Sequence, residues 1–246
     1  MTRLFRSLAA LACLMALSAC LVTPGTFESH LDIRADRSFA FAYKGEILAS
    51  DMGKDALSGT TPSAGSDDAQ EGEAEAGPTM MQIAAKDEDF STPDNRGDAA
   101  QMQAIAAALS KEKGFRAARY VGNHRFEIDY AISGTLTHAF LFPFNIDAQI
   151  VLPFVAVELR GADRLRVKAP GFANGFGKNP STAGMGGSND EAAKALKGTF
   201  TLTTDAEIVS QNQEDGAQGT PQGKRIVWTI SSMTAEAPVA TLRVRP

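Results

Sequence analysis

The chain has 246 residues, a formal net charge of −5, two cysteines and 22% charged residues. This length suffices for one large domain or two small ones with a sizeable core. The slightly acidic balance excludes nucleic acid as an expected partner, because binding to phosphates requires a positive field.

Residues 1–19 have the layout of a cleaved export signal. Arg3 and Arg6 precede an apolar run that ends at Leu17, and this run is shorter than the roughly 20 residues that span a bilayer. Leu17-Ser18-Ala19-Cys20 resembles the processing site of bacterial lipoproteins, which implies cleavage before Cys20 and acylation of Cys20. The alternative is an ordinary secretory signal in which Cys20 is one more thiol.

The same resemblance implies a location. Leu21, not Asp, follows Cys20, and similarity to proteobacterial lipoproteins then favours the outer membrane, with the domain facing the periplasm. The membrane is therefore the first expected partner, through an N-terminal lipid anchor. Removal of residues 1–19 also removes Cys13, so no disulfide can form within the mature chain.

The mature chain is expected to begin with a short lipidated tether, residues 20–26, followed by a single domain over residues 27–246. Apolar and polar residues alternate from Phe27 to Ala35, and after Asp36-Arg37 the odd positions 39, 41 and 43 are aromatic. A period of two on both sides of a turn predicts a β-hairpin with one buried face.

Two segments are expected to interrupt this domain. Residues 50–78 are rich in Ser, Gly, Ala, Asp and Glu with almost no large apolar side chains, which predicts a disordered acidic insertion. Residues 170–189 are rich in Gly, Pro and Asn, and such a long run without periodicity predicts a flexible loop.

The remaining elements are one helix and several strands. Met102, Ile105, Ala106 and Leu109 follow helical spacing within residues 98–113. Gly122-Asn123 and Gly161-Ala162-Asp163 are turn sequences between alternating runs. Phe200 to Ile208 is expected to form one half-buried strand, and further strands are expected around Trp228 and over residues 239–244.

These elements predict an α+β domain: a twisted antiparallel sheet of about eight strands with one principal helix and a disordered acidic insertion. Antiparallel pairing is expected because turns, not alternating helices, join the strands. Two separate sandwiches are the alternative.

Catalytic and cofactor motifs are not evident in the sequence. His30, His124 and His138 lack metal-ligand spacing, and Ser110-Lys111-Glu112-Lys113 lacks the companion motifs of penicillin-recognising enzymes. The glycine-rich loop does not have the spacing of a phosphate-binding loop. We therefore expect no metal, no cofactor and no enzymatic activity, with a hydrolase built from scattered residues left open.

The residues that suggest binding are apolar. Phe172, Phe176 and Met185 lie in the 170–189 loop, and a second aromatic cluster extends from Phe140 to Phe144. Either these side chains belong to a buried core, or the loop residues form a lid over an apolar groove and bind its ligand.

Two segments carry a distant family resemblance. TFESHLDIRADRSFAFAYKGEI (residues 26–47) and RIVWTI (residues 225–230) resemble an uncharacterised family of bacterial envelope lipoproteins, and the order of elements is similar to that of LppM-like lipoproteins. The resemblance implies an open sheet-and-helix domain with lipid-binding capacity. The expected function is a membrane-anchored lipoprotein that binds lipid or another apolar envelope ligand; a protein-interaction or envelope-assembly lipoprotein is the alternative.

Overall fold

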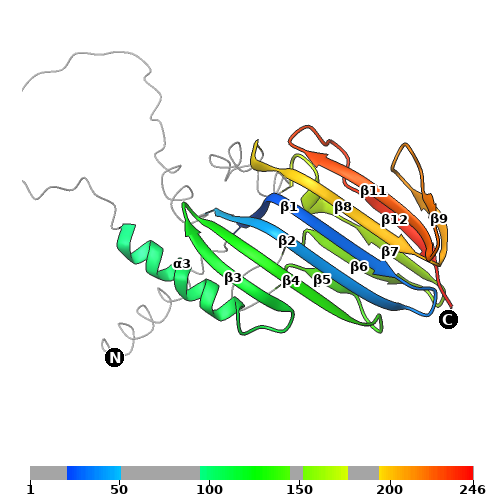
Figure 1. The fold of residues 1–246 in the computed structure, drawn as a ribbon, viewed down its shortest axis with the longest axis horizontal. Helices are drawn as coiled ribbons and strands as arrows, with labels where there is room; N and C mark the ends of the chain where they lie inside the picture. The colour runs from blue at the N-terminus through cyan, green and yellow to red at the C-terminus, as the bar shows by residue number, and fades with distance from the viewer. Residues whose placement is uncertain (1–20, 51–94, 145–151, 177–193, 246) are drawn as a thin grey trace, which may run out of the picture.

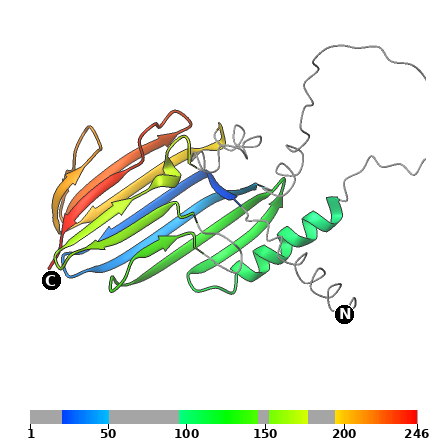
Figure 2. The same ribbon diagram turned by 180° about the vertical axis from the view of Figure 1, so that it is seen from behind.

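The computed structural model describes residues 21–50, 95–144, 152–176 and 194–245. Within these ranges the chain forms two β-sheets in two layers, with helix α3 (Asn95–Leu109) next to the edge strand of one of them (Figure 1). Figure 2 shows the same layers from behind.

The first sheet contains seven strands, of which the two longest form the hairpin at its centre. The strands are β1 (Leu21–Ile33), β2 (Ser38–Ser50), β3 (Phe115–Gly122), β4 (Arg125–Thr135), β8 (Lys197–Thr204), β10 (Gln218–Thr220) and β11 (Gly223–Ser231). Their order is β10-β11-β8-β1-β2-β4-β3. All neighbours are antiparallel except β1 and β8, which run parallel.

The second sheet contains five shorter antiparallel strands. They are β5 (Phe140–Phe142), β6 (Val155–Arg160), β7 (Arg164–Lys168), β9 (Glu207–Gln211) and β12 (Val239–Arg243), in the order β5-β6-β7-β12-β9. A short 3₁₀ helix, η2 (Pro170–Phe172), follows β7.

The predicted fold class, an α+β domain on one antiparallel sheet of about eight strands, is wrong. The fold is mainly β, with seven strands in one sheet and five in the other, and the larger sheet contains a parallel pair. The alternative of two separate sandwiches does not hold either, because buried residues of both sheets belong to one continuous core. The described ranges therefore form a single sandwich.

The predicted hairpins are confirmed. β1 and β2 pair antiparallel around Arg37, whose φ of 69° lies in the left-handed region. β3 and β4 are joined at Gly122 and Asn123, with φ of 90° and 50°, and β6 and β7 are joined at Gly161, with φ of 70°. The turns at Gly122 and Gly161 were readable because residue types that tolerate positive φ stand where the chain must reverse. The turn at Arg37 was readable from the period of two in the strands on both sides of it.

The strand predicted from Phe200 to Ile208 is instead two strands in different sheets. β8 ends at Thr204 in the first sheet, and β9 begins at Glu207 in the second. The crossing is held by two side chains, since Asp205 Oδ1 accepts a hydrogen bond from the Ala35 N–H at 2.7 Å and Thr204 Oγ1 accepts one from the Ala206 N–H at 3.0 Å. The alternation of apolar residues continues through the crossing, so periodicity alone did not reveal it.

Helix α3 begins and ends slightly earlier than predicted, at Asn95 and Leu109 instead of residues 98 and 113. Its expected apolar stripe is confirmed: Met102, Ala106 and Leu109 are buried in the common core, with Ile105 partly buried against it. The helix packs against β3, the edge strand of the first sheet, and so covers that edge of the sheet.

The domain starts earlier than expected. β1 begins at Leu21, so residues 21–26, predicted to be a tether, are part of a strand. Residues 1–19, Cys20 and the predicted insertion beyond Ser50 lie outside the described residues, as do residues 177–189 of the predicted flexible loop.

Aromatic rings fill the space between the sheets. Phe41 and Tyr43 of β2 lie 5.0 Å from Phe142 of β5, measured between ring centroids. Phe172, 0% exposed, stacks on Phe27 at 4.2 Å and lies 5.5 Å from Phe200. These contacts connect both sheets through one continuous group of rings.

Replacing Phe172 by Ala should therefore lower the free energy of unfolding by about 3–5 kcal/mol, the usual cost of removing a buried ring. The matched control Phe144→Ala, at a ring that is 47% exposed, should cost clearly less. Urea unfolding followed by the fluorescence of Trp228 measures both. Equal costs for the two variants would place Phe172 outside the core.

Candidate functional site

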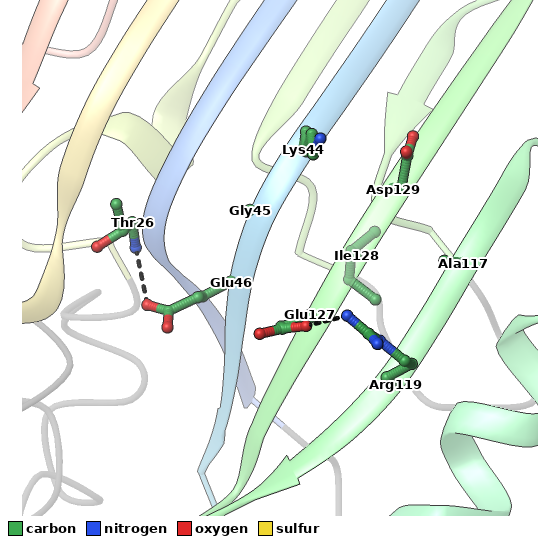
Figure 3. A pocket seen from close by; sticks show the side chains of 9 residues that line it. All are labelled: Thr26, Lys44, Gly45, Glu46, Ala117, Arg119, Glu127, Ile128 and Asp129. Carbon is green, nitrogen blue, oxygen red and sulfur yellow. Dashed lines mark hydrogen bonds and ion pairs between the residues drawn. The ribbon is translucent and has the colours of Figure 1, made fainter.

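A groove of about 550 Å³ lies on the outer face of the first sheet, across β2, β4 and β3 (Figure 3). Because successive strand residues point to opposite faces, Phe126 and Tyr130 are buried toward the second sheet while Glu127 and Asp129 line the groove. The other lining residues are Thr26, Lys44, Gly45, Glu46, Ala117, Arg119 and Ile128.

A β-bulge in β1 shapes one wall of the groove. Between the pairs Pro24–Ile47 and Phe27–Gly45, two residues of β1 oppose the single residue Glu46. Such a bulge increases the local twist and changes the direction of the side chains. Here it brings the backbone N–H of Thr26 to Glu46, and the N–H donates a hydrogen bond to Glu46 Oε2 at 3.3 Å.

Tyr43 supports the same wall from inside the sandwich. Its hydroxyl donates a hydrogen bond to the backbone carbonyl oxygen of Glu46 at 2.8 Å. The side chain is fully buried, and this burial raises the pKa of Tyr43 well above its usual value. The hydroxyl therefore stays protonated, and the donor that holds Glu46 in place is present throughout the physiological pH range.

Two carboxylates lie side by side in the groove. Glu46 and Glu127 are direct cross-strand neighbours, a position in which like charges destabilise a sheet. Each is offset by an arginine: Arg125 Nη1 lies 3.2 Å from Glu46 Oε1, and Arg119 Nη2 lies 2.6 Å from Glu127 Oε2. In the neighbouring row Lys44 faces Asp129 across the same two strands.

These ion pairs are exchangeable. The side chains of Arg119 and Glu127 are 73% and 48% exposed, and surface pairs of this kind contribute only about 0–1 kcal/mol each. A cation from a ligand can therefore replace either arginine without unfolding the sheet. The lining includes three acidic and two basic side chains, so the groove is chemically suited to a polar, charged group rather than to an apolar one.

The structure places the sequence-predicted loop residues elsewhere. Phe172 is buried between the sheets, and Phe176 is partly buried, with its ring centroid 5.8 Å from that of Phe154. Phe172 is thus part of the core, the other reading that its sequence allowed, and not an exposed lid residue. Met185 and Cys20 lie outside the described residues.

The histidines do not form a metal site with their described neighbours. His30 Nε2 lies 3.4 Å from Thr203 Oγ1, and that hydroxyl donates a hydrogen bond to Asp32 Oδ2 at 2.6 Å. Asp32 is also paired with Arg34 at 2.5 Å. In the described ranges no cluster of three or more His, Cys, Asp or Glu side chains is close enough to hold a metal ion.

Sequence reasoning missed the groove residues. Lys44 and Glu46 on one strand and Glu127 and Asp129 on another were visible as the polar half of an alternating pattern, which usually marks a solvated face. Only the register of β2 against β4 shows that Glu46 and Glu127 are neighbours. That register pairs residues about 80 positions apart in the sequence and cannot be read from either strand alone.

Comparisons with known proteins find little. No family model matches the sequence, and no curated protein matches it. The NMR structure of the folded domain of LppM from Mycobacterium tuberculosis aligns with 92% of this chain and 95% of that chain, at 13% sequence identity and a TM-score of 0.32. This is a weak resemblance to a lipoprotein domain, and nothing about the ligand of this chain follows from it.

No helix in the described ranges has the length and apolar character needed to cross a bilayer.

Gly45 should be required for the wall of the groove. A Cβ at this position would lie 2.5 Å from the Cα of Phe27, inside the bulged backbone of β1. Gly45→Ala should therefore lower the free energy of unfolding by about 1–3 kcal/mol, as overpacking does. Urea denaturation provides the measurement.

The matched control is Gly134→Ala on β4, where the added Cβ would lie 3.6 Å from Phe39 Cε1, an ordinary contact. This variant should keep nearly the stability of the parent chain. If both alanine variants are equally stable, the close approach of β1 and β2 at the bulge does not constrain the groove.

Proposed function

We propose that the chain is a lipid-anchored envelope lipoprotein, acylated at Cys20, that resides in the outer membrane and faces the periplasm. The support is the sequence Leu17-Ser18-Ala19-Cys20 after a short apolar run, together with Leu21 in the next position. Two or three acyl chains on one residue give a stable anchor, whereas a single chain gives only a marginal one.

We further propose that the domain is a protein-interaction module, not an enzyme. Its groove binds a positively charged segment of an envelope protein. The observation that carries this proposal is the pair of neighbouring carboxylates Glu46 and Glu127. Each is held by an exposed and therefore weak ion pair with an arginine, and a Lys or Arg of the partner can take the place of that arginine.

An apolar ligand is the competing proposal, and the described residues support it less. The groove is lined by five charged side chains, whereas pockets for lipids are lined mainly by apolar ones. The rings between the sheets contact one another, and Phe172 among them is buried. Charge complementarity rather than apolar burial is therefore the basis of the proposed function.

Cys20→Ser should abolish acylation and release the protein into the soluble periplasmic fraction, because the serine hydroxyl does not replace the thiol in lipid attachment. Metabolic labelling with palmitate and membrane fractionation measure the two effects. Ser18→Thr, which keeps a small residue near the processing site, serves as the control. A Cys20→Ser protein that is still labelled and still in the membrane would overturn the anchor.

The groove itself is tested by photo-crosslinking in the native cells. A photoreactive amino acid in place of Ala117, an uncharged lining residue, should give a discrete crosslinked product with one envelope protein. Adding Glu46→Gln with Glu127→Gln should reduce that product at least about tenfold, equivalent to about 1.4 kcal/mol of binding free energy. Glutamine keeps an oxygen that can accept the hydrogen bond from Thr26.

A matched control removes the same charge elsewhere. Glu214→Gln with Glu236→Gln alters two exposed acidic residues outside the groove lining, so the product should persist. If both double variants crosslink equally, the groove is not the binding surface. If native mass spectrometry of the purified domain shows a stoichiometric bound lipid that the groove variants retain, the apolar-ligand function replaces the one proposed here.

A further inference from the structure

The proposed acylation site stands directly beside the first residue of the sheet. β1 begins at Leu21, and consecutive Cα atoms are about 3.8 Å apart across a trans peptide bond. If Cys20 carries the acyl chains, the start of β1 is therefore held at the bilayer surface with no stalk between them. The strands that end beside Leu21 then lie close to the lipid headgroups.

Two further segments end at this same corner of the first sheet. Leu21 pairs with Ser50, the last residue of β2, and the N–H of Ala49 donates a hydrogen bond to the carbonyl oxygen of His124 at 2.8 Å. The β3–β4 turn, Gly122 to His124, is thus tied to the end of β2. Three strand spacings of about 4.8 Å each place β3 roughly 15 Å from β1 across the sheet.

Val121 is the apolar side chain at this turn. It precedes Gly122, is 48% exposed and lies at the same end of the sheet as Leu21. Asn123 and Arg125 are also exposed and follow on the other side of the turn. An apolar side chain with polar and cationic neighbours is the composition that favours the boundary between headgroups and acyl chains.

The other half of the sheet stops short of this corner. Lys197, the first residue of β8, pairs with Thr26 of β1 and with Ser231 of β11. β8 therefore begins at the level of Thr26, five residues along β1 from Leu21, which corresponds to about 17 Å along the strand. Met233, which is 86% exposed, lies two residues beyond Ser231, and Ser231 is at the level of Thr26 rather than of Leu21.

We infer that the β3–β4 turn, with Val121 beside it, is a membrane-contacting surface that enters the headgroup layer of the bilayer holding the acylated Cys20. This inference rests on the proposed lipid anchor. The long hairpin strands stand on the bilayer at their Leu21 end, and Met233 stays in water although it is the more exposed of the two apolar side chains.

The mature chain allows a direct test, because Cys20 is its sole cysteine and acylation blocks the thiol. Val121→Cys, Met233→Cys and Val209→Cys, each in the acylated full chain, are labelled with an environment-sensitive fluorophore and reconstituted into phosphatidylethanolamine–phosphatidylglycerol vesicles. The label at 121 should shift its emission to shorter wavelength and lose at least half of its intensity to nitroxide-labelled lipids. The labels at 233 and 209 should show water-like emission and little quenching.

Vesicle flotation of the unlabelled protein tests the lipid anchor separately from the membrane contact of the β3–β4 turn. If the wild-type chain does not float, the anchor fails and this inference fails with it. If the chain floats and the label at 121 keeps water-like emission, the anchor stands and the contact surface is overturned. Quenching at 233 equal to that at 121 also overturns it, because the domain would then lie on its side.

Discussion

The stacking of Phe27 on Phe172 is the contact on which the rest of the sandwich depends. Phe27 is the residue at which the bulge in β1 ends, and its ring stacks on Tyr43 of the same sheet at 5.6 Å and on Phe172 beside the second sheet at 4.2 Å. One irregularity in β1 therefore acts on both faces. It directs Phe27 into the core and Thr26 toward Glu46 in the groove.

Local features of the fold were predictable from the sequence, because their physical causes are local. The turns at Arg37, Gly122 and Gly161 all contain a residue with positive φ. Glycine and asparagine marked the second and third of these turns, and the alternating pattern on both sides marked the first. The stripe of Met102, Ala106 and Leu109 follows from the period of the helix alone. These predictions needed no knowledge of which strand pairs with which.

Features set by long-range pairing were not predictable in the same way. The parallel contact of β1 with β8 joins residues about 170 positions apart, and alternation shows a buried face without showing which sheet buries it. Phe172 illustrates the limit: glycine and proline beside it suggested an exposed loop, whereas η2 is short and directs the ring between Phe27 and Phe200. The composition of the segment therefore did not predict the burial of this one side chain.

The charged lining of the groove is compatible with the proposed lipid anchor. Thr26 lies six residues after Cys20, so the groove wall is no more than about 20 Å along the strand from the proposed lipid attachment. An apolar groove at that height would compete with the bilayer itself for any greasy ligand, since acyl chains bury apolar surface equally well. A groove lined by carboxylates avoids this competition, because a charged ligand does not partition into the acyl chains. In the function proposed above, Glu46 and Glu127 select partners by charge at a short distance from the membrane. A domain on a long stalk would instead sample a much larger volume.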